Sequence, residues 1–340
     1  MISSLNNAKV LFFLYFSKRL SNFGVNMKTV SIIIPVYNRA NLVSRTLKSV
    51  LDQTYRPLQV ILVDNFSTDD SLVILNQFKI ENSMPDFEVI VAQEKQHTAS
   101  AARNRGMQFA TGDYLMFFDS DDIMERRLVQ KYVDAFKSSP QRVDVIICRR
   151  NQVDIYGEKK IMPLHKKDLI ANHILHSVLA TQAFCARHDF IRNIAWNNSL
   201  SHWNDFEYGL RVLLAKPVVG YLEGKPRVDV IYGGDNSITG NSFSANHGKW
   251  EISLRYMRLD IENSQLRNKQ RYYDLLSYRL LVLAAHYERE GHPEFAKPAC
   301  QKAYSELNRK WLYRKVMPWL FKRIVQGKRG SARIARWMIK

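Results

Sequence analysis

Short apolar runs alternate with helical segments between residues 29 and 118, and this alternation is the strongest constraint on the fold. Thr29–Val36 (T-V-S-I-I-I-P-V) and Leu58–Val63 (L-Q-V-I-L-V) are rich in β-branched residues and nearly free of polar ones. Such runs are typical of strands that are buried on both faces of a parallel sheet. Phe87–Ala92 and Tyr114–Phe118 are predicted as the third and fourth strands. The pattern predicts an α/β fold with a mostly parallel sheet and right-handed crossovers.

The segments between these strands have apolar residues at helical spacing. The first predicted helix contains Leu42–Leu51, with Asn38 or Asn41 as its expected cap. The second passes through Leu72–Phe78, and the third contains Ala99–Ala110. Each strand is therefore expected to be followed by one helix.

The composition is that of a folded protein with a sizeable core. Apolar residues make up 46% of the 340 residues, and Gly and Pro are too scarce for a low-complexity chain. The three cysteines are widely spaced, which argues against a disulfide framework or a structural zinc site and favours a reducing compartment. No apolar run is long enough to span a membrane as a helix.

Three parts of the chain are expected. Residues 1–27 are interpreted as an N-terminal extension: a poorly ordered leader, a short interfacial anchor, or the result of a wrongly assigned start codon, because Met27 directly precedes the first strand. Residues 28–240 are expected to form the α/β domain. Residues 241–340 are expected to form a basic helical region, because their apolar residues recur at helical spacing.

The excess of positive charge lies at the C-terminal end. The chain has 50 Lys and Arg against 32 Asp and Glu, and Arg309–Lys340 contains eleven basic residues, no acidic ones, and three tryptophans. Anionic lipid and nucleic acid both attract such a segment. No nucleic-acid-binding motif is present, so an anionic membrane surface is the favoured partner and nucleic acid is disfavoured. The alternative is a solvated basic face that packs on the domain through its aromatic residues.

Polar side chains directly follow three of the predicted strands. Tyr37 and Asn38 follow the first, Asp64 and Asn65 the second, and Asp119–Asp122 the fourth. Ligands of open α/β sheets bind beyond the carboxyl ends of the strands, so these residues are expected around one crevice. Neither a dinucleotide-binding G-x-G-x-x-G segment nor a P-loop is present.

The acidic group after the fourth strand is a candidate metal site. Three carboxylates within four positions repel one another unless a cation lies among them. Hard oxygen ligands with open positions suit Mg²⁺ or Mn²⁺ shared with the phosphates of a nucleoside diphosphate. The alternative is the N-terminus of a helix that begins near Ile123, with Asp119 or Ser120 as its cap.

Five short motifs follow one another within about a hundred residues: S-I-I-I-P-V-Y-N (31–38), V-D-N-F-S-T-D (63–69), A-R-N-R-G (102–106), G-D-Y-L (112–115) and F-D-S-D-D (118–122). Together they resemble the family 2 inverting glycosyltransferases of GT-A fold. The resemblance is strongest from Val30 to Arg126, weakens to Thr239 and is absent beyond it. It implies a GT-A domain with a helical C-terminal appendage, of the type that builds bacterial polysaccharides and cell-surface glycans.

The resemblance implies a nucleotide site at the first strand ends. Asp64 and Arg103 are expected on the nucleotide side. The family's usual V-D-D-G-S reads V-D-N-F-S here, so Asn65 replaces a carboxylate that contacts the base; its carbonyl oxygen can still accept a hydrogen bond, but bases other than uracil become harder to exclude. Asp64 and Asn65 as ordinary turn residues are the alternative. The residues expected to line the uracil pocket are Pro35, Val36, Tyr37 and Asn38.

The resemblance also implies the metal ligands and the catalytic base. Its D-x-D pattern corresponds to Asp119, expected near the ribose and metal, and Asp121, expected as the direct ligand of Mn²⁺ or Mg²⁺. The second acidic residue of the acceptor-side E-D motif corresponds to Asp205, the expected base, with Asn204 in place of the Glu. Glu207 is the fallback base, and helix capping is the alternative for Asp205.

A later segment, Tyr232–Thr239 (Y-G-G-D-N-S-I-T), resembles the family's segment that closes over the diphosphate. Gly234 occupies the position of the family's His, so a phosphate or metal contact from that position is not expected.

The resulting expectation is a metal-dependent inverting glycosyltransferase with a nucleotide-sugar donor, expected to be a UDP-sugar. Its acceptor would be a hydroxyl of a glycan or of a lipid-linked substrate, and the basic segment 309–340 would place the enzyme on the cytoplasmic face of the plasma membrane. The alternatives are a non-catalytic nucleotide-sugar-binding protein, a basic nucleic-acid-binding or membrane-binding protein, and a nucleotidyltransferase.

Overall fold

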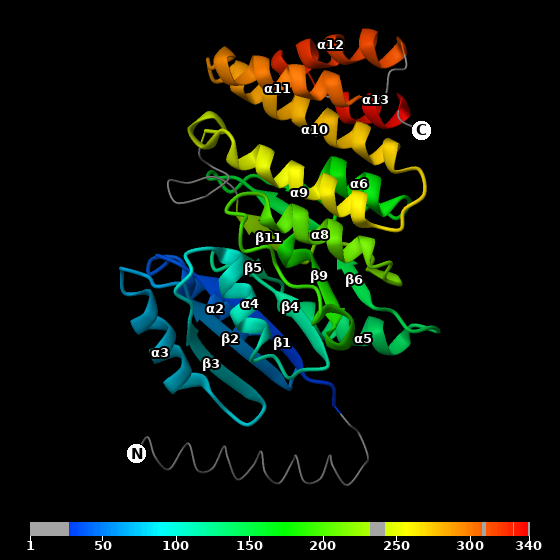
Figure 1. Ribbon diagram of the computed structural model, residues 1–340. Helices are drawn as coiled ribbons and strands as arrows, with labels where there is room; N and C mark the ends of the chain where they lie inside the picture. The colour runs from blue at the N-terminus through cyan, green and yellow to red at the C-terminus, as the bar shows by residue number, and fades with distance from the viewer. Residues whose placement is uncertain (1–26, 232–241, 308–310, 329, 339–340) are drawn as a thin grey trace, which may run out of the picture. The chain divides into compact units, whose positions relative to one another are not determined.

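The computed structural model describes residues 27–231, 242–307, 311–328 and 330–338. These residues divide into two compact units (Figure 1). The first unit contains residues 27–150, 182–195 and 218–230. The second contains residues 151–181, 196–217 and the described residues from 231 onward. Residues 151–181 and 196–217 are thus grouped with the C-terminal helices, although they lie inside the stretch expected to form the α/β domain.

A seven-stranded sheet forms the centre of the first unit, in the order β10-β6-β9-β4-β1-β2-β3. All neighbours are parallel except β9, which is antiparallel to both β4 and β6. The α/β fold with a mostly parallel sheet is therefore confirmed. The bounds of the strands are β1 Val30–Val36, β2 Leu58–Asp64, β3 Phe87–Gln93, β4 Tyr114–Phe117, β6 Val145–Cys148, β9 Phe184–Arg187 and β10 Val219–Leu222.

The register of the first three strands brings their carboxyl ends level with one another. Val36 of β1 pairs with Asp64 of β2, and Asp64 pairs with Gln93 of β3. Every residue of β1 and β2 is buried, which is why both strands are continuous apolar runs rather than alternating ones. The residues that follow these strands therefore leave the sheet at one edge.

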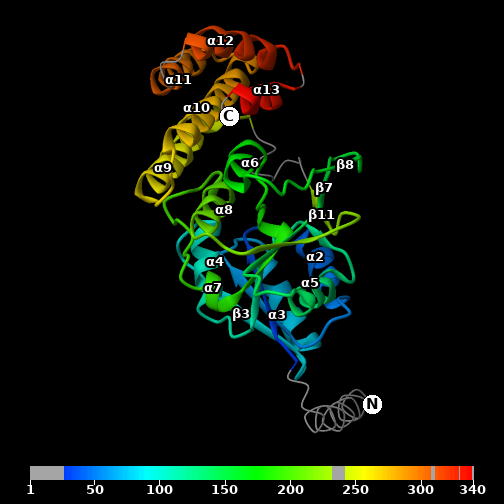
Figure 2. The ribbon, with the colours of Figure 1, turned by 90° about the vertical axis from the view of Figure 1, so that its right-hand side faces the viewer.

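Helices cover both faces of this sheet, with α2 (Val43–Leu51) and α5 (Leu128–Ser138) opposite α4 (Ala99–Met107) and α7 (His188–Ile191) (Figure 2). The helix α3 (Ser71–Asn82) connects β2 to β3.

Two local expectations about these helices are wrong. The cap of α2 is Leu42, without a side-chain hydrogen bond, so neither Asn38 nor Asn41 caps the helix that begins at Val43. No helix begins near Ile123: β5 (Ile123–Met124) pairs antiparallel with β11 (Val228–Ile231). A short apolar stretch after polar residues fits either element, and pairing with a strand about a hundred residues later decides between them.

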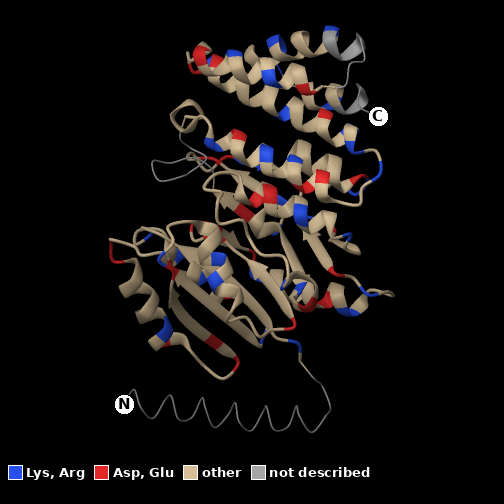
Figure 3. Ribbon diagram, viewed as in Figure 1, with Lys and Arg blue, Asp and Glu red and all other residues tan. Residues whose placement is uncertain are grey.

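The second unit is mainly helical. Its apolar core gathers residues from α6, α8, α9, α10, α11, α12 and α13, and α10 contacts α6, α9, α11, α12 and α13. Figure 3 shows Lys and Arg distributed along these helices. The bounds are β7 Arg150–Val153, β8 Lys159–Ile161, α6 Leu169–His176, α8 Asn204–Leu214, α9 Lys249–Asn263, α10 Lys269–Arg289, α11 Pro293–Glu306, α12 Trp311–Val325 and α13 Ser331–Met338.

The C-terminal helices were expected from their apolar spacing, and helices are present there. Across the described ranges, no helix is both long enough and apolar enough to cross a bilayer. The cysteines among these residues form no disulfide. The N-terminal extension (1–26) and the expected diphosphate segment Tyr232–Thr239 lie outside the described residues.

Candidate functional site

The end of β1 presents one exposed ring and one fixed turn. Pro35 and Val36, expected to line a base pocket, are buried strand residues, whereas Tyr37 is 48% exposed. Asn38 has a left-handed backbone with φ of 49°, which Asn tolerates better than most residues. Its Oδ1 accepts a hydrogen bond from the backbone N–H of Thr68 at 2.8 Å. Asn38 therefore joins the loops after β1 and β2, and Tyr37 provides the ligand-accessible side chain.

Asp64 and Asn65 are both buried at the end of β2, and both bind the neighbouring strand end. Asp64 accepts a hydrogen bond from Nε2 of Gln93 at 3.1 Å. Nδ2 of Asn65 donates to the backbone carbonyls of Glu94 and Gln96, each at 2.8 Å. These bonds fix the loop after β3 against β2. Asp64 also accepts hydrogen bonds from the backbone N–H of Ser67 at 3.3 and 3.4 Å, so the turn role that was the alternative is present as well.

Asp119 follows β4 and is held from two directions. Nη2 of Arg103, on α4, lies 2.7 Å from its Oδ1, and Arg103 is only 4% exposed. Nε2 of Gln182, next to β9, donates to the other carboxylate oxygen. The structure thus brings together the predicted residues Arg103 and Asp119 and adds Gln182.

Asp121 lies near two arginines, one just before α2 and one on it. Its Oδ2 is 3.7 Å from Nη2 of Arg39, and its backbone carbonyl accepts a hydrogen bond from Arg45 at 2.8 Å. Burial and the negative charge of Asp119 raise the pKa of the Asp121 carboxyl above its ordinary value, while Arg39 and Arg45 lower it. The carboxylates of Asp119 and Asp121 therefore lie close enough to repel each other, in a partly desolvated position at the edge of the sheet.

These carboxylates fit a divalent cation that a ligand helps to hold. Among the described residues, no three His, Cys, Asp or Glu side chains form a cluster that could bind a metal without further ligands. Asp119 and Asp121 offer hard oxygen atoms, and their mutual repulsion is the condition that a divalent cation relieves. The pair suits Mg²⁺ or Mn²⁺ with phosphate oxygens in the remaining positions. Helix capping is not the reason for these acids, because β5 follows them.

In the second unit, Asp205 and Glu207 lie in the first turn of α8 and differ sharply in exposure. Asp205 is half-buried, and the cap of the helix is Trp203, so Asp205 does not fill the capping position. Glu207 is 1% exposed, and Arg211 binds both of its carboxylate oxygens, at 2.6 and 3.0 Å. Asp205 is thus the more accessible carboxylate, and the burial of Glu207 disfavours it as a fallback base.

Several side chains at the strand edge were not found by sequence reasoning. Arg39 and Arg45 lie before and within α2, where a basic residue gives no signal of its own. Gln182 is 63 residues from Asp119 and reaches it because β9 lies beside β4. Phe66 and His97 follow β2 and β3, and their rings lie near one another. A search for aromatic residues in the loops that follow the strands would have found the last two.

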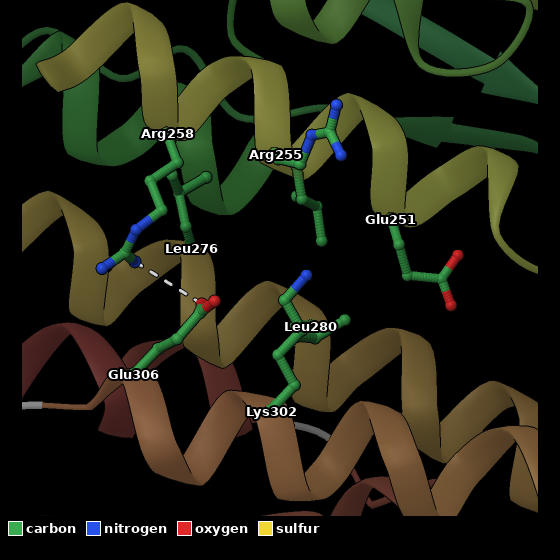
Figure 4. Close-up of a pocket in the computed structure, with 8 residues that line it drawn as sticks. Glu251, Arg255, Arg258, Leu276, Leu280, Lys302 and Glu306 are labelled. Carbon is green, nitrogen blue, oxygen red and sulfur yellow. Dashed lines mark hydrogen bonds and ion pairs between the residues drawn. The ribbon is translucent and has the colours of Figure 1, made fainter.

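The pockets described in the structure contain none of the predicted site residues. One is lined by residues of α9, α10 and α11, among them Arg255, Arg258 and Lys302 (Figure 4). Arg258 pairs there with Glu306 at 3.5 Å. Another lies on the hairpin of β7 and β8. Both of these pockets therefore lie away from the predicted site residues at the strand ends.

Comparison with known proteins connects residues 31–193 with a family. The sequence model described as Glycosyl transferase family 2 matches residues 31–193. The glycosyltransferase GlyG of Streptococcus pneumoniae is 32% identical over 101 residues, which are 30% of this chain and 33% of GlyG. The amylovoran biosynthesis glycosyltransferase AmsB of Erwinia amylovora is 24% identical over 277 residues, which cover 77% of this chain and 85% of AmsB. The chain thus spans about a third of GlyG but most of AmsB.

Solved structures support the same fold. Residues 1–349 of Staphylococcus aureus TarS in complex with UDP-GlcNAc align with a TM-score of 0.60 and 15% identity, covering 84% of this chain and 93% of that one. GalNAc-T7 with UDP, GalNAc and Mn²⁺ aligns with a TM-score of 0.53 and 17% identity, covering 86% of this chain and 57% of that one. At this identity the likeness concerns the fold, which is the expected GT-A fold. Residues 31–193 of this chain therefore match the model of glycosyltransferase family 2, and the solved structures share its fold.

Proposed function

We propose that the protein is a metal-dependent inverting glycosyltransferase that moves a sugar from a nucleotide-sugar donor, expected to be a UDP-sugar, to a hydroxyl group. The observation that carries this proposal is the grouping of Asp119 and Asp121 with three arginines at the carboxyl edge of a family 2 domain. Such an edge offers both cationic donors and hard oxygen ligands to a diphosphate. Solved neighbours of the same fold were crystallised with UDP, with UDP-GlcNAc, and with UDP and Mn²⁺, which supports the choice of substrate class.

On the donor side, each residue has a distinct task. Arg103 holds Asp119 in place, and Arg39 does the same for Asp121. Asp121, with Asp119, would hold Mn²⁺ or Mg²⁺, which when bound supplies Lewis-acid stabilisation of the departing diphosphate. Tyr37 offers a ring for the base to stack on. Asn65 offers an acceptor oxygen to the edge of the base.

On the acceptor side, Asp205 is proposed as the general base. The acceptor oxygen forms a bond to the anomeric carbon while the bond from that carbon to the diphosphate oxygen breaks, and Asp205 takes the hydroxyl proton. The N-terminus of α8 favours a negative charge at this position. Glu207 is better suited to hold Arg211 and the helix than to reach an acceptor.

The proposal is tested by thermal-shift and calorimetric titration of the full chain with UDP and UDP-sugars, with and without Mn²⁺, followed by a UDP-release assay. Asp205→Asn should keep donor binding and lower transfer by about 10²–10⁴-fold. Asp121→Asn should abolish metal-dependent binding. The matched control is Asp113→Asn, because Asp113 lies in the loop before β4 and pairs with Lys28. Full transfer by Asp205→Asn, or metal-dependent binding that survives in Asp121→Asn, would contradict these roles.

A metal-independent transferase is the second candidate. Arg39, Arg45 and Arg103 already contact Asp119 or Asp121, and guanidinium groups can bind a diphosphate without a metal. This candidate predicts that transfer continues at an unchanged rate in EDTA. The metal-dependent proposal predicts loss of transfer in EDTA and recovery with Mn²⁺.

The C-terminal region is proposed to hold the enzyme at an anionic membrane surface, which would suit a lipid-linked or membrane-bound glycan acceptor at the cytoplasmic face of the plasma membrane. On α12, Lys315, Pro318, Trp319 and Lys322 are all exposed at helical spacing, and Trp319 is 47% exposed. Arg323 stacks on the Trp319 ring at 5.0 Å. An exposed tryptophan among cations suits the headgroup region of anionic lipid.

A further inference from the structure

Three exposed rings lie at the ends of three neighbouring strands. Tyr37 follows β1, Phe66 follows β2 and His97 follows β3, and Phe66 is 38% exposed. The His97 ring centroid lies 5.9 Å from that of Tyr37 and 6.4 Å from that of Phe66, nearly perpendicular to both. Single exposed apolar residues need no explanation, but three aromatic rings at one sheet edge form a defined surface.

Phe66 has a backbone conformation that residues with a side chain rarely adopt. Its φ is 58°, in the left-handed region that costs a non-glycine residue conformational free energy. The family 2 segment that this loop resembles has Gly at this position, which removes the cost. Here the strain holds a large apolar ring partly in solvent, where it contributes little to the core. Strained residues of this kind cluster at ligand sites, so the position points to a role for the ring in binding a ligand.

The side-chain amide of Asn65, beside Phe66, has one orientation only, and this decides which of its atoms a ligand can meet. Both of its amide hydrogens are donated, to the carbonyls of Glu94 and Gln96. The reverse orientation would place its oxygen against two carbonyl oxygens, so the assignment of the amide is dictated by its partners. What remains for a ligand is Oδ1, which can only accept. An Asp at this position could not donate to either carbonyl.

We propose that Phe66 and His97 are further specificity-determining residues that, with Tyr37, form an aromatic rim for the base of the donor. Oδ1 of Asn65, which the proposed function already places at the edge of the base, then accepts from a ring N–H. Uracil carries such an N–H, whereas the corresponding ring nitrogen of cytosine is an acceptor and would leave two acceptors opposed. Stacking of a base on an aromatic face supplies affinity with little dependence on sequence. The inference rests on the proposed function, because it needs a nucleotide at this edge.

The hydrogen-bond part is tested by calorimetric titration of the full chain with UDP, N3-methyl-UDP and CDP in the presence of Mn²⁺. UDP should bind at least about tenfold more tightly than N3-methyl-UDP or CDP. Neither of these two ligands has an N–H at the ring nitrogen that faces Oδ1 of Asn65. N3-methyl-UDP is the sharper probe, since it differs from UDP at the ring N–H alone. Equal affinity for UDP and CDP would overturn the role of Asn65.

The stacking part is tested with Phe66→Gly and His97→Ala. Glycine adopts the left-handed backbone without strain, so Phe66→Gly should keep or raise the melting temperature while its UDP affinity falls about 5- to 100-fold. Phe66→Leu, which keeps bulk but not the ring, should also bind UDP weakly. The control is Met84→Gly, because Met84 is a 41% exposed apolar residue in the turn before β3, at the opposite end of that strand.

The outcomes separate this inference from the proposed function. If UDP binds with Mn²⁺ but Phe66→Gly and His97→Ala bind it as tightly as the natural protein, the aromatic rim is wrong and the transferase proposal stands. If no nucleoside diphosphate binds with Mn²⁺ or Mg²⁺, the proposed function is wrong and this inference falls with it.

Discussion

Arg103 and Asp119 form a charged hydrogen bond of 2.7 Å between α4 and the end of β4, with the arginine 4% exposed. The two residues belong to separate sequence motifs, A-R-N-R-G and F-D-S-D-D, so the bond explains why both motifs occur together. Since Asp119 is also held by Gln182, its carboxylate orientation is fixed before any ligand arrives. A fixed carboxylate is the kind of group that a metal-assisted site requires.

Replacing Arg103 is expected to destabilise the first unit. Arg103→Met removes the charge that compensates a partly buried Asp119, so the free energy of unfolding should fall by about 1–3 kcal/mol in urea titration. Arg105→Met is the matched control, because Arg105 is on the same helix and its hydrogen bond to Gln108 is exposed. That control should change stability by less than about 1 kcal/mol. An Arg103→Met protein as stable as the control would show that the bond contributes nothing.

Gly106, the last residue of A-R-N-R-G, is explained by the strand beneath it. A Cβ at Gly106 would lie 2.4 Å from Cγ2 of Ile33 in β1, with the Ile33 side chain supplying all the closest contacts. Gly106→Ala would normally favour a helix by about 1 kcal/mol, but the overlap should make it destabilising by about 1–3 kcal/mol. The double variant Gly106→Ala with Ile33→Ala should lose less stability than the sum of the single variants, measured by urea denaturation. Simple additivity would contradict the contact.

The strands of the first unit could be predicted because burial on both faces leaves a plain signal in sequence. Val30–Val36 and Leu58–Asp64 lie within one residue of the predicted runs, and the polar residues after them do gather at one edge. The strand β9 gave no such signal, because Phe184–Arg187 is short and pairs antiparallel with strands far away in the chain. Gln182 was missed for the same reason.

Side-chain roles within the site were less predictable than its place. Nothing in the sequence distinguishes Glu207 from Asp205 as a base, because burial and the contact with Arg211 depend on packing within the second unit. Likewise, the amide of Asn65 gains its fixed direction only from the carbonyls after β3. Motif spacing locates a site, whereas the direction of each polar group depends on long-range contacts.

His202 is expected to make the protein sensitive to acid. Burial, with a further effect from Lys249, lowers the pKa of His202 from 6.5 to about 4. Between pH 6.5 and 4 the unfolded chain therefore binds a proton that the folded protein does not, so stability falls as pH falls through this window. His202→Phe keeps a ring beside Trp250 and removes the titration. Its melting temperature should fall less than that of the natural protein between pH 7 and 4.5; an equal fall would refute the assignment.

Asp260 should act in the opposite direction. Burial and the negative charge of Glu207 raise its pKa from 3.8 to about 7, against the opposing effect of Arg211. Between pH 4 and 7 the folded protein thus binds more protons than the unfolded chain, so this group lowers stability as pH rises, and its cost is complete above pH 7. Asp260→Asn should melt at a higher temperature than the natural protein at pH 8 and at a similar temperature below pH 4. A variant that is less stable at pH 8 would contradict this expectation.

Trp319 provides the test of membrane attachment. Its ring is 47% exposed on α12, with Lys322 on the same face and Arg323 stacked against it. Inserting half an indole into the headgroup region contributes roughly 1–2 kcal/mol, so Trp319→Ala should weaken binding to phosphatidylglycerol vesicles about tenfold in co-sedimentation. Leu259→Ala is the control, because Leu259 is an apolar residue 41% exposed on α9, outside the α12 face. Binding to phosphatidylcholine vesicles should be weak for all three proteins, because neutral lipid offers no attraction to the cations. Equal sedimentation of Trp319→Ala and Leu259→Ala with anionic vesicles would rule out this face as the attachment site, even if the chain itself binds them.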